Sequence, residues 1–194
     1  IGIDGLLTSD QMVTDIYEAM SHFDVRNEYS KQMGEALAVS ADGAILAEIA
    51  KLAVEQKENI TGLGKGVILD KQIDATDMGI TEAEGKMIVQ MLLELKAKFS
   101  NQYVPATERY VYMKPDGVAA LVASWNAINR DFGAVGTLVD GNVTKIAGFN
   151  IIEVPHLTDG GADGTHVLRS GTAHDFPSTY KDKCVFVAAH HTAV

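Results

Sequence analysis

The sequence is poor in cysteine, proline and long hydrophobic runs. It has 1 Cys, 4 Pro and 1 Trp among 194 residues. The single Cys184 excludes a disulfide within the chain and a zinc site built from cysteines. No apolar run reaches the roughly 18–20 residues that a membrane-spanning helix needs. No basic start precedes an apolar stretch, so no signal peptide is visible; the lack of an initiator Met suggests an excerpt from a longer protein.

Positive charge is also scarce. Lys and Arg number 16 against 26 Asp and Glu, which gives a formal net charge of −10. A protein that coats nucleic acid needs clustered Lys and Arg to neutralise phosphates, so the charge balance argues against that class. Hydrophobic residues at 46% and charged residues at 22% are typical of a globular protein. The length suits one larger domain or two small lobes.

Helical periodicity dominates the first third of the chain. Thr8 and Gln11 form a capping box, and the apolar spacing that follows predicts a helix over about residues 9–22. A second apolar stripe, with Asp24 as a suitable N-cap, predicts a much longer helix over about 24–56. Its members are Val25, Tyr29, Met33, Leu37, Ala41, Ile45, Ile49 and Leu52.

The predicted long helix is a rod of about 45–50 Å, at a rise of ~1.5 Å per residue. Its apolar residues recur mostly at every fourth position, which fits a coiled coil poorly. Its middle is rich in small residues, namely Gly34, Ala36, Ala38, Ser40, Ala41, Gly43, Ala44 and Ala47. Small side chains let another backbone approach closely, so we predict a spine crossed by a sheet or a second helix.

The remainder of the chain mixes helices with strands. Thr81 and Glu84 form a second capping box, ahead of an amphipathic helix that ends near Ser100. Pro115 opens a shorter helix, in which Trp125 is expected to face inward. Strands are expected over residues 1–7, 109–114, 137–139, 143–146, 148–154 and 184–189, with one more suggested at 67–69. The pattern predicts an α+β fold built on one sheet.

Gly62, Gly64 and Gly66 surround Lys65 and resemble a phosphate-binding loop. A P-loop requires Gly-x-x-x-x-Gly-Lys followed by Ser or Thr, but Lys65 is followed by glycine and the upstream glycine is missing. A dinucleotide fingerprint also fails, because no strand precedes the glycines and no periodic helix follows. We interpret the segment as a turn.

A long loop over residues 156–179 is the other candidate site. Loops of this length are usually functional or are ordered by a neighbour. It contains His156, His166 and His174 together with Asp159, Asp163 and Asp175. A metal site is conceivable there, but the spacing is neither that of a metalloprotease helix nor that of an EF-hand loop. We favour a solvated loop.

The other reactive residues have simple structural interpretations. Cys184 precedes an apolar run, which favours a small buried packing residue over a nucleophile with a partner base. His190 and His191 are adjacent and follow the last predicted strand; on a strand they would point to opposite faces, so both could not easily ligate one ion. No serine lies in a Gly-x-Ser-x-Gly elbow. We therefore predict no catalytic residue, no cofactor-binding residue and no metal ligand.

A series of short sequence motifs, taken in their order along the chain, is a more specific indication of function than any single residue. The motifs include Ile3-Asp4-Gly5-Leu6-Leu7-Thr8, Ala41-Asp42-Gly43-Ala44, Leu46-Ala47-Glu48-Ile49-Ala50, Tyr103-Val104-Pro105-Ala106 and Glu153-Val154-Pro155-His156-Leu157-Thr158. With them the sequence resembles the major capsid protein of T7-like short-tailed (podovirus) bacteriophages, of the HK97-like capsid family. The resemblance covers essentially the whole chain.

The resemblance implies an α+β HK97-like capsid fold with two domains. Residues 1–78 would be part of the peripheral domain, with the spine helix at 24–56. Residues 79–178 would form a central-sheet axial domain that carries the long loop 156–179, and 179–194 would be a return strand toward the peripheral domain. The family has an N-terminal arm and an extended loop before the position of Ile1, and a further strand after that of Val194.

The same resemblance implies a structural role without a cofactor. A major capsid protein self-assembles into hexamers and pentamers that form an icosahedral shell. Scaffolding and portal proteins would be partners during assembly in the host bacterial cytoplasm, and the product would be a virion. Packaged DNA would be enclosed without specific binding, no membrane would be involved, and the net negative charge suits a wall that repels phosphate.

Two other functions remain open at this stage. The first is a metal-dependent enzyme that uses the His- and Asp-rich loop 156–179 as a lid over its site. Metal analysis of the protein and of its His166→Ala and His174→Ala variants would discriminate it from a capsid protein. The second is a free-standing binding module in which the same loop grips a partner, which a pull-down by the isolated chain would support.

Overall fold

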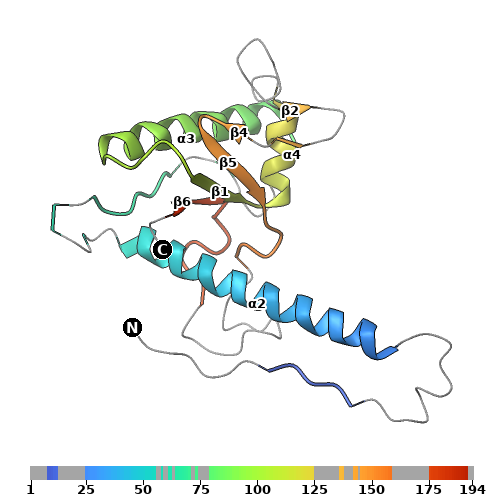
Figure 1. The fold of residues 1–194 in the computed structure, drawn as a ribbon. Coiled ribbons are helices and arrows are strands. Elements are labelled where there is room, and N and C mark those ends of the chain that lie inside the picture. Colours follow the sequence, from blue (N-terminus) through green and yellow to red (C-terminus); the bar gives the residue numbers. More distant parts are fainter. Residues whose placement is uncertain are drawn as a thin grey trace.

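The computed structural model describes residues 8–12, 25–55, 58, 61–62, 64–70, 73, 79–124, 136–137, 142–143, 145–158 and 175–191. The elements are α2 (Val25–Glu55), α3 (Glu82–Asn101), β1 (Arg109–Met113), α4 (Pro115–Ala123), β2 (Gly136–Thr137), β3 (Asn142–Val143), β4 (Lys145–Ile146), β5 (Phe149–Glu153) and β6 (Phe186–His190). They form three layers, with α3 and α4 on one side of a sheet and α2 on the other (Figure 1).

The central sheet has the strand order β4-β5-β1-β6. β1 pairs in parallel with β5 and antiparallel with β6, so that Val111 lies opposite Ile151 on one side and Ala188 on the other. Parallel neighbours need a crossover connection, and α4, directly after β1, begins it. β4 and β5 are joined by Ala147 and Gly148, whose φ angles of 52° and 89° are what a two-residue type I′ hairpin turn requires.

The first core lies between this sheet and the two helices above it. Its buried members are Ile88, Met91, Leu92 and Leu95 of α3, Val118, Ala120 and Leu121 of α4, and Val111, Met113, Ile146, Phe149 and Val185 from the sheet side. Alternate residues of a strand face opposite sides. Val111 and Met113 therefore belong to this core, while Tyr112 between them packs against the core on the other face.

The second core lies between the sheet and the C-terminal half of α2. Leu46, Ala47, Ile49 and Ala50 of the helix pack with Val154, Leu157, Phe176, Val187 and Ala189. Ala47 is completely buried in the same cluster as Val187 and Ala189 of β6. Of the small residues predicted to admit a close neighbour, Ser40, Gly43 and Ala47 are buried, whereas Gly34, Ala38 and Ala41 are exposed.

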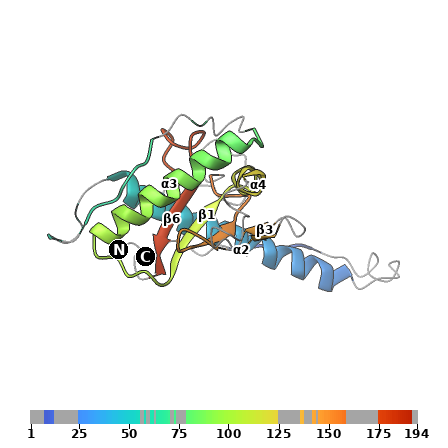
Figure 2. The same cartoon turned by 90° about the horizontal axis from the view of Figure 1, so that it is seen from above.

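The N-terminal half of α2 extends beyond these layers. The helix has 31 residues and is unbroken at Gly43, so it is about 46 Å long. Its first buried side chain is Ser40, and residues 26–39 are exposed or half-buried. Roughly 20 Å of rod therefore projects past the sheet, as seen from the side and from above (Figures 1 and 2).

Most of the predicted elements are confirmed, with shifts of one to three residues at their ends. These are the helices predicted at 24–56, at Thr81–Ser100 and from Pro115, and the strands predicted at 109–114, 148–154 and 184–189. The strands predicted at 137–139 and 143–146 appear as the short pieces β2, β3 and β4. The predicted strand at 1–7, residues 13–22 and Trp125 lie outside the described residues.

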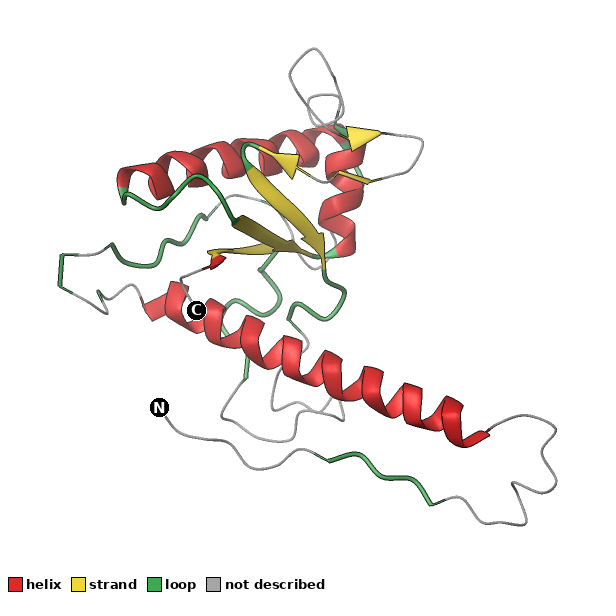
Figure 3. Cartoon of the chain, viewed as in Figure 1, coloured by secondary structure: helices red, strands yellow, loops and turns green. Residues whose placement is uncertain are grey.

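Two predictions are wrong where the structure tests them. Residues 8–12 carry no helix, so the predicted helix start at Ser9 fails (Figure 3). All five are exposed, and Met12 is 88% exposed; without a packed face, the capping signal alone does not stabilise a helix. Residues 67–69 form no strand either; they lie in a loop whose Leu69 packs against the first core.

Candidate functional site

The His- and Asp-rich loop is described only at its two stems. His166, His174, Asp159 and Asp163 lie outside the described residues. The stems themselves are structural, because Leu157 and Phe176 are both buried in the second core. In the part of the chain that the structure describes, no three His, Cys, Asp or Glu side chains gather in a way that could hold a metal ion.

His156 and Asp175 flank those two buried residues. Each is half-buried, and the His156 Nε2 and Asp175 Oδ1 atoms are fully enclosed. Neither residue is joined by an ion pair or hydrogen bond to a further acid, base or nucleophile among the described residues. Neither atom has a hydrogen-bond partner among the described residues, so the two do not form a reactive group.

The Gly62–Gly66 segment is a turn and a crossing point, not a phosphate site. Gly62 has a φ of 88°, and its N–H donates to the Glu58 carboxylate at 3.3 Å. A Cβ on Gly66 would lie 2.6 Å from the Cα and the carbonyl oxygen of Ala53. Glycine is required at this position because its backbone passes directly against α2.

Lys65 takes part in the same crossing through its main chain. Its carbonyl accepts a hydrogen bond from the Gln102 side-chain amide at 3.1 Å. A Cβ on Gly64 would lie 2.5 Å from Cδ of that glutamine, so the segment also runs against the end of α3. The glycines join the ends of two helices, which confirms the prediction of a turn.

Cys184 has the environment of a packing residue. It lies at the edge of the second core, and its Sγ donates a 3.5 Å hydrogen bond to the Phe186 carbonyl. Burial raises the pKa of the thiol from 9.0 to about 11, although the positive charge of Lys114 opposes the shift. A thiol with a raised pKa is a poor nucleophile at neutral pH, as the sequence interpretation expected.

The two adjacent histidines differ sharply in exposure. His190 is buried at the end of β6, whereas His191 is exposed and lies 3.8 Å from the carboxylate of Glu108. The His191 N–H also donates to the Glu108 carbonyl at 3.1 Å. The two contacts between His191 and Glu108 therefore connect the end of β6 to the start of β1.

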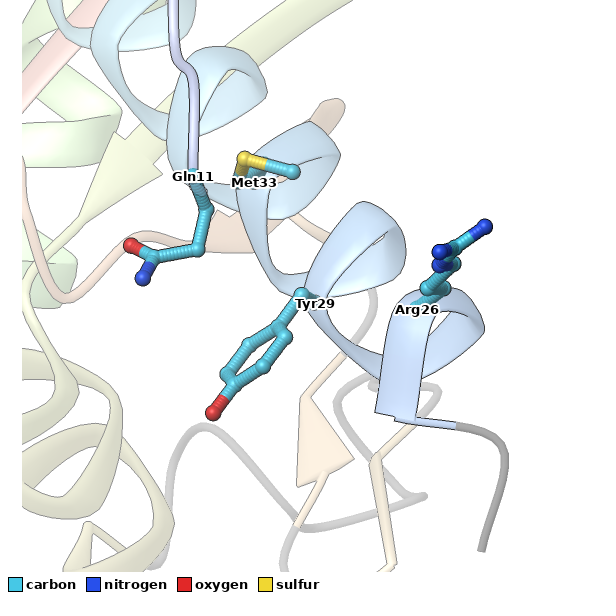
Figure 4. A pocket seen from close by; sticks show the side chains of 4 residues that line it. All are labelled: Gln11, Arg26, Tyr29 and Met33. Atoms are coloured by element: carbon cyan, nitrogen blue, oxygen red, sulfur yellow. The ribbon is translucent and has the colours of Figure 1, made fainter. Parts of the chain in front are cut away.

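An open hollow lies between the extended segment 8–12 and the projecting half of α2. It is lined by Gln11, Arg26, Tyr29 and Met33 (Figure 4). Gln11 lies beside Met33, and the Tyr29 ring hangs from the next turn of the helix. These side chains include no carboxylate and no nucleophile with a base, so the hollow offers contact surface and no evident chemistry.

The turn between α3 and β1 is a constrained surface feature that the sequence analysis missed. Tyr103 and Glu108 have φ angles of 58° and 55°, which bulky residues rarely adopt. Arg109, only 3% exposed, donates from Nε to the Pro105 carbonyl at 2.7 Å and from Nη2 to the Val104 carbonyl at 2.6 Å.

The Arg109 guanidinium is also held by aromatic rings. Its central carbon lies 5.6 Å from the ring centroid of Phe99 and 6.0 Å from that of Phe149. These two rings meet edge to face, with their centroids 5.6 Å apart. A buried arginine thus connects the first core to the surface turn through cation–π contacts and two hydrogen bonds.

Comparison with known proteins identifies the family. A family model described as "Gp10A-like: Major capsid protein" matches residues 1–194. The major capsid protein of Escherichia phage T7 is 39% identical over 205 residues, a match to 100% of this chain and 59% of that protein. The major capsid protein of Enterobacteria phage T3 is 39% identical over 206 residues, with the same shares covered. The chain thus spans about 59% of the length of these relatives.

Solved capsid structures show the same fold. A chain from the capsid of the cyanophage P-SCSP1u matches with a TM-score of 0.72 and 29% identity, over 92% of this chain and 54% of that one. A chain from the mature capsid of bacteriophage PhiM1 matches in fold with a TM-score of 0.63 and 17% identity, over 98% of this chain and 64% of that one. The fold is the α+β HK97-like capsid fold. This chain belongs to the Gp10A-like family of major capsid proteins.

Proposed function

We propose that the protein containing this chain is a structural shell subunit that self-associates into hexamers and pentamers around phage DNA. The observation that carries the proposal is α2, one unbroken helix braced against the sheet at one end and projecting at the other. A subunit of a closed shell needs a stiff element that reaches past its own core toward a neighbour. Family membership supports the same role, and the work is done by shape and not by a reactive site.

The domain division follows the same reasoning. Residues 1–78 form part of a peripheral domain with the spine helix, and residues 79–178 form an axial domain around the first core and the long loop 156–179. Residues 179–194 return toward the peripheral domain. β6 supports this position, because it pairs with β1 in the central sheet while its Val187 and Ala189 pack against α2.

Partners and location follow from the role. Scaffolding and portal proteins would act during assembly in the host bacterial cytoplasm, and the assembled protein would be part of the virion. The net charge of −10 suits a wall that encloses DNA without binding it specifically. None of the helices that the structure describes combines the length and the apolar character that crossing a bilayer requires.

Expression of the full-length protein alone, followed by electron microscopy, tests this proposal. Closed shells are the expected result. A species that stays small at every protein concentration, also when a scaffolding protein is co-expressed, would contradict self-assembly. Metal analysis of the same preparation adds an independent readout, because stoichiometric metal that is lost on His166→Ala and His174→Ala would favour an enzyme instead.

A further inference from the structure

The turn after α3 places a large aromatic residue where the backbone favours glycine. The Tyr103 N–H donates to the Ser100 carbonyl, and the Val104 N–H donates to the Phe99 carbonyl, at 3.1 and 3.0 Å. These two bonds define a Schellman motif at the helix C-terminus, in which the residue with left-handed φ is usually glycine. Here that residue is Tyr103, with a φ of 58°.

The Tyr103 side chain gives the fold nothing in exchange for this strain. It is 94% exposed and belongs to neither hydrophobic core. A left-handed backbone is unfavourable for a residue with a Cβ, so glycine would satisfy the same two hydrogen bonds with less strain. Strained residues that the surrounding structure holds in place tend to mark functional positions.

The turn holds Tyr103 as a fixed protrusion. The Val104 and Pro105 carbonyls both accept hydrogen bonds from Arg109, whose guanidinium is held against Phe99 and Phe149. The far end of the turn is fixed by the Glu108 carbonyl, which accepts from the His191 N–H. A rigid exposed aromatic loses little entropy when it is buried at an interface, and tyrosine is enriched among the residues that dominate binding energy.

We propose that Tyr103 is a contact residue for a second copy of this chain, with its ring buried on the neighbouring subunit in the shell. The proposal rests on the shell role argued above and goes beyond it by naming one residue of the interface. A second copy is the occupant that fits, because rings of identical subunits use heterologous contacts, in which a protrusion on one copy meets a different surface on the next. The turn follows the C-terminus of α3, and Tyr103 on it is 94% exposed, so a neighbour can reach the ring.

The test uses the full-length protein with Tyr103→Gly and Tyr103→Asn, since asparagine also tolerates the left-handed conformation. Two quantities are measured: the urea midpoint of the unassembled subunit and the protein concentration at which shells form. We expect a midpoint that is unchanged or raised, and a threshold concentration raised at least about tenfold, as for loss of an interface hot spot. Tyr103→Phe keeps the ring and should assemble within about twofold of wild type.

Ala147→Gly is the matched control. Ala147 has a φ of 52° in the β4–β5 turn, so the change relieves similar backbone strain without removing an exposed aromatic, and the threshold should not move. Wild-type shells with an unchanged threshold for Tyr103→Gly would overturn the assignment of Tyr103 and leave the shell role standing. A lowered midpoint in both Tyr103→Gly and Tyr103→Asn would show that the ring supports the fold. Absence of wild-type shells even when a scaffolding protein is co-expressed would refute both proposals.

Discussion

Replacement of Gly85 by alanine should force α3 and α4 apart. Gly85 is buried where the two helices cross, and an added Cβ would lie 2.2 Å from the Ala120 carbonyl oxygen and 2.7 Å from the Ser124 Cβ. Carbon and carbonyl oxygen come no closer than about 3.3 Å even in weak C–H hydrogen bonds. The obstacle is backbone, which has no alternative rotamer, so the helices must separate by about 1 Å.

The cost of that separation exceeds the benefit of alanine. A 1 Å gap forfeits about a quarter to a half of each dispersion contact across it, and Ile88, Leu92 and Leu121, all fully buried, line this interface. Overpacking of this kind costs about 3 kcal/mol. The higher helix propensity of alanine offsets up to ~1 kcal/mol of this packing cost. We expect the free energy of unfolding to fall by about 2 kcal/mol.

Gly34→Ala is the matched control for this prediction. Gly34 is also inside a helix, but a Cβ there would meet nothing within 4 Å. Only the propensity term applies, so the free energy of unfolding should rise by up to ~1 kcal/mol. Urea titration of both variants, followed by far-ultraviolet circular dichroism, measures the two values. If Gly85→Ala stabilised the protein as Gly34→Ala does, the close crossing of α3 and α4 would be refuted.

Two further predictions concern Arg109 and Cys184. Arg109→Met fills the same space but leaves the Val104 and Pro105 carbonyls without their donor, so the free energy of unfolding should fall by about 2 kcal/mol; an unchanged urea midpoint would contradict the proposed role of the arginine. Burial raises the pKa of the Cys184 thiol from 9.0 to about 11, so the unfolded chain loses the thiol proton at lower pH than the folded chain does. The thiol's contribution to stability is therefore present below pH 9 and is lost between pH 9 and 11. The stability of wild type should therefore fall more steeply than that of Cys184→Ala over this range, and equal slopes in urea titrations would contradict it.

Local signals in the sequence predicted much of the fold. Thr81 illustrates why. Its hydroxyl accepts from the Glu84 N–H at 3.3 Å and donates to the Glu84 carboxylate at 2.8 Å, so this N-cap needs residues only three positions apart. The spine was predicted in the same way, from an apolar stripe that continues through Gly43 without a turn signal. Capping and periodicity signals of this kind depend only on residues that are a few positions apart in the sequence.

Features that depend on distant residues were not predictable in the same way. The backbone of Gly66 passes too close to Ala53 for a side chain, and that of Gly64 too close to Gln102. No sequence pattern predicts these contacts. Arg109 appeared only as the first residue of a strand, because its burial between Phe99 and Phe149 is set by tertiary packing. The helix predicted from Ser9 failed for the converse reason, since a strong local signal without a packing partner does not decide structure.

Assembly of a full-length Glu35→Pro variant, compared with Glu35→Ala, tests most directly whether the projecting rod builds the shell. Glu35 is exposed in the part of α2 that precedes the second core, so neither change alters buried side chains. Proline removes one helical hydrogen bond and clashes with the preceding turn, at a cost of ~3 kcal/mol, and it kinks or breaks the helix there. Electron microscopy should show closed shells for Glu35→Ala and none for Glu35→Pro. Normal shells from the proline variant would contradict the account.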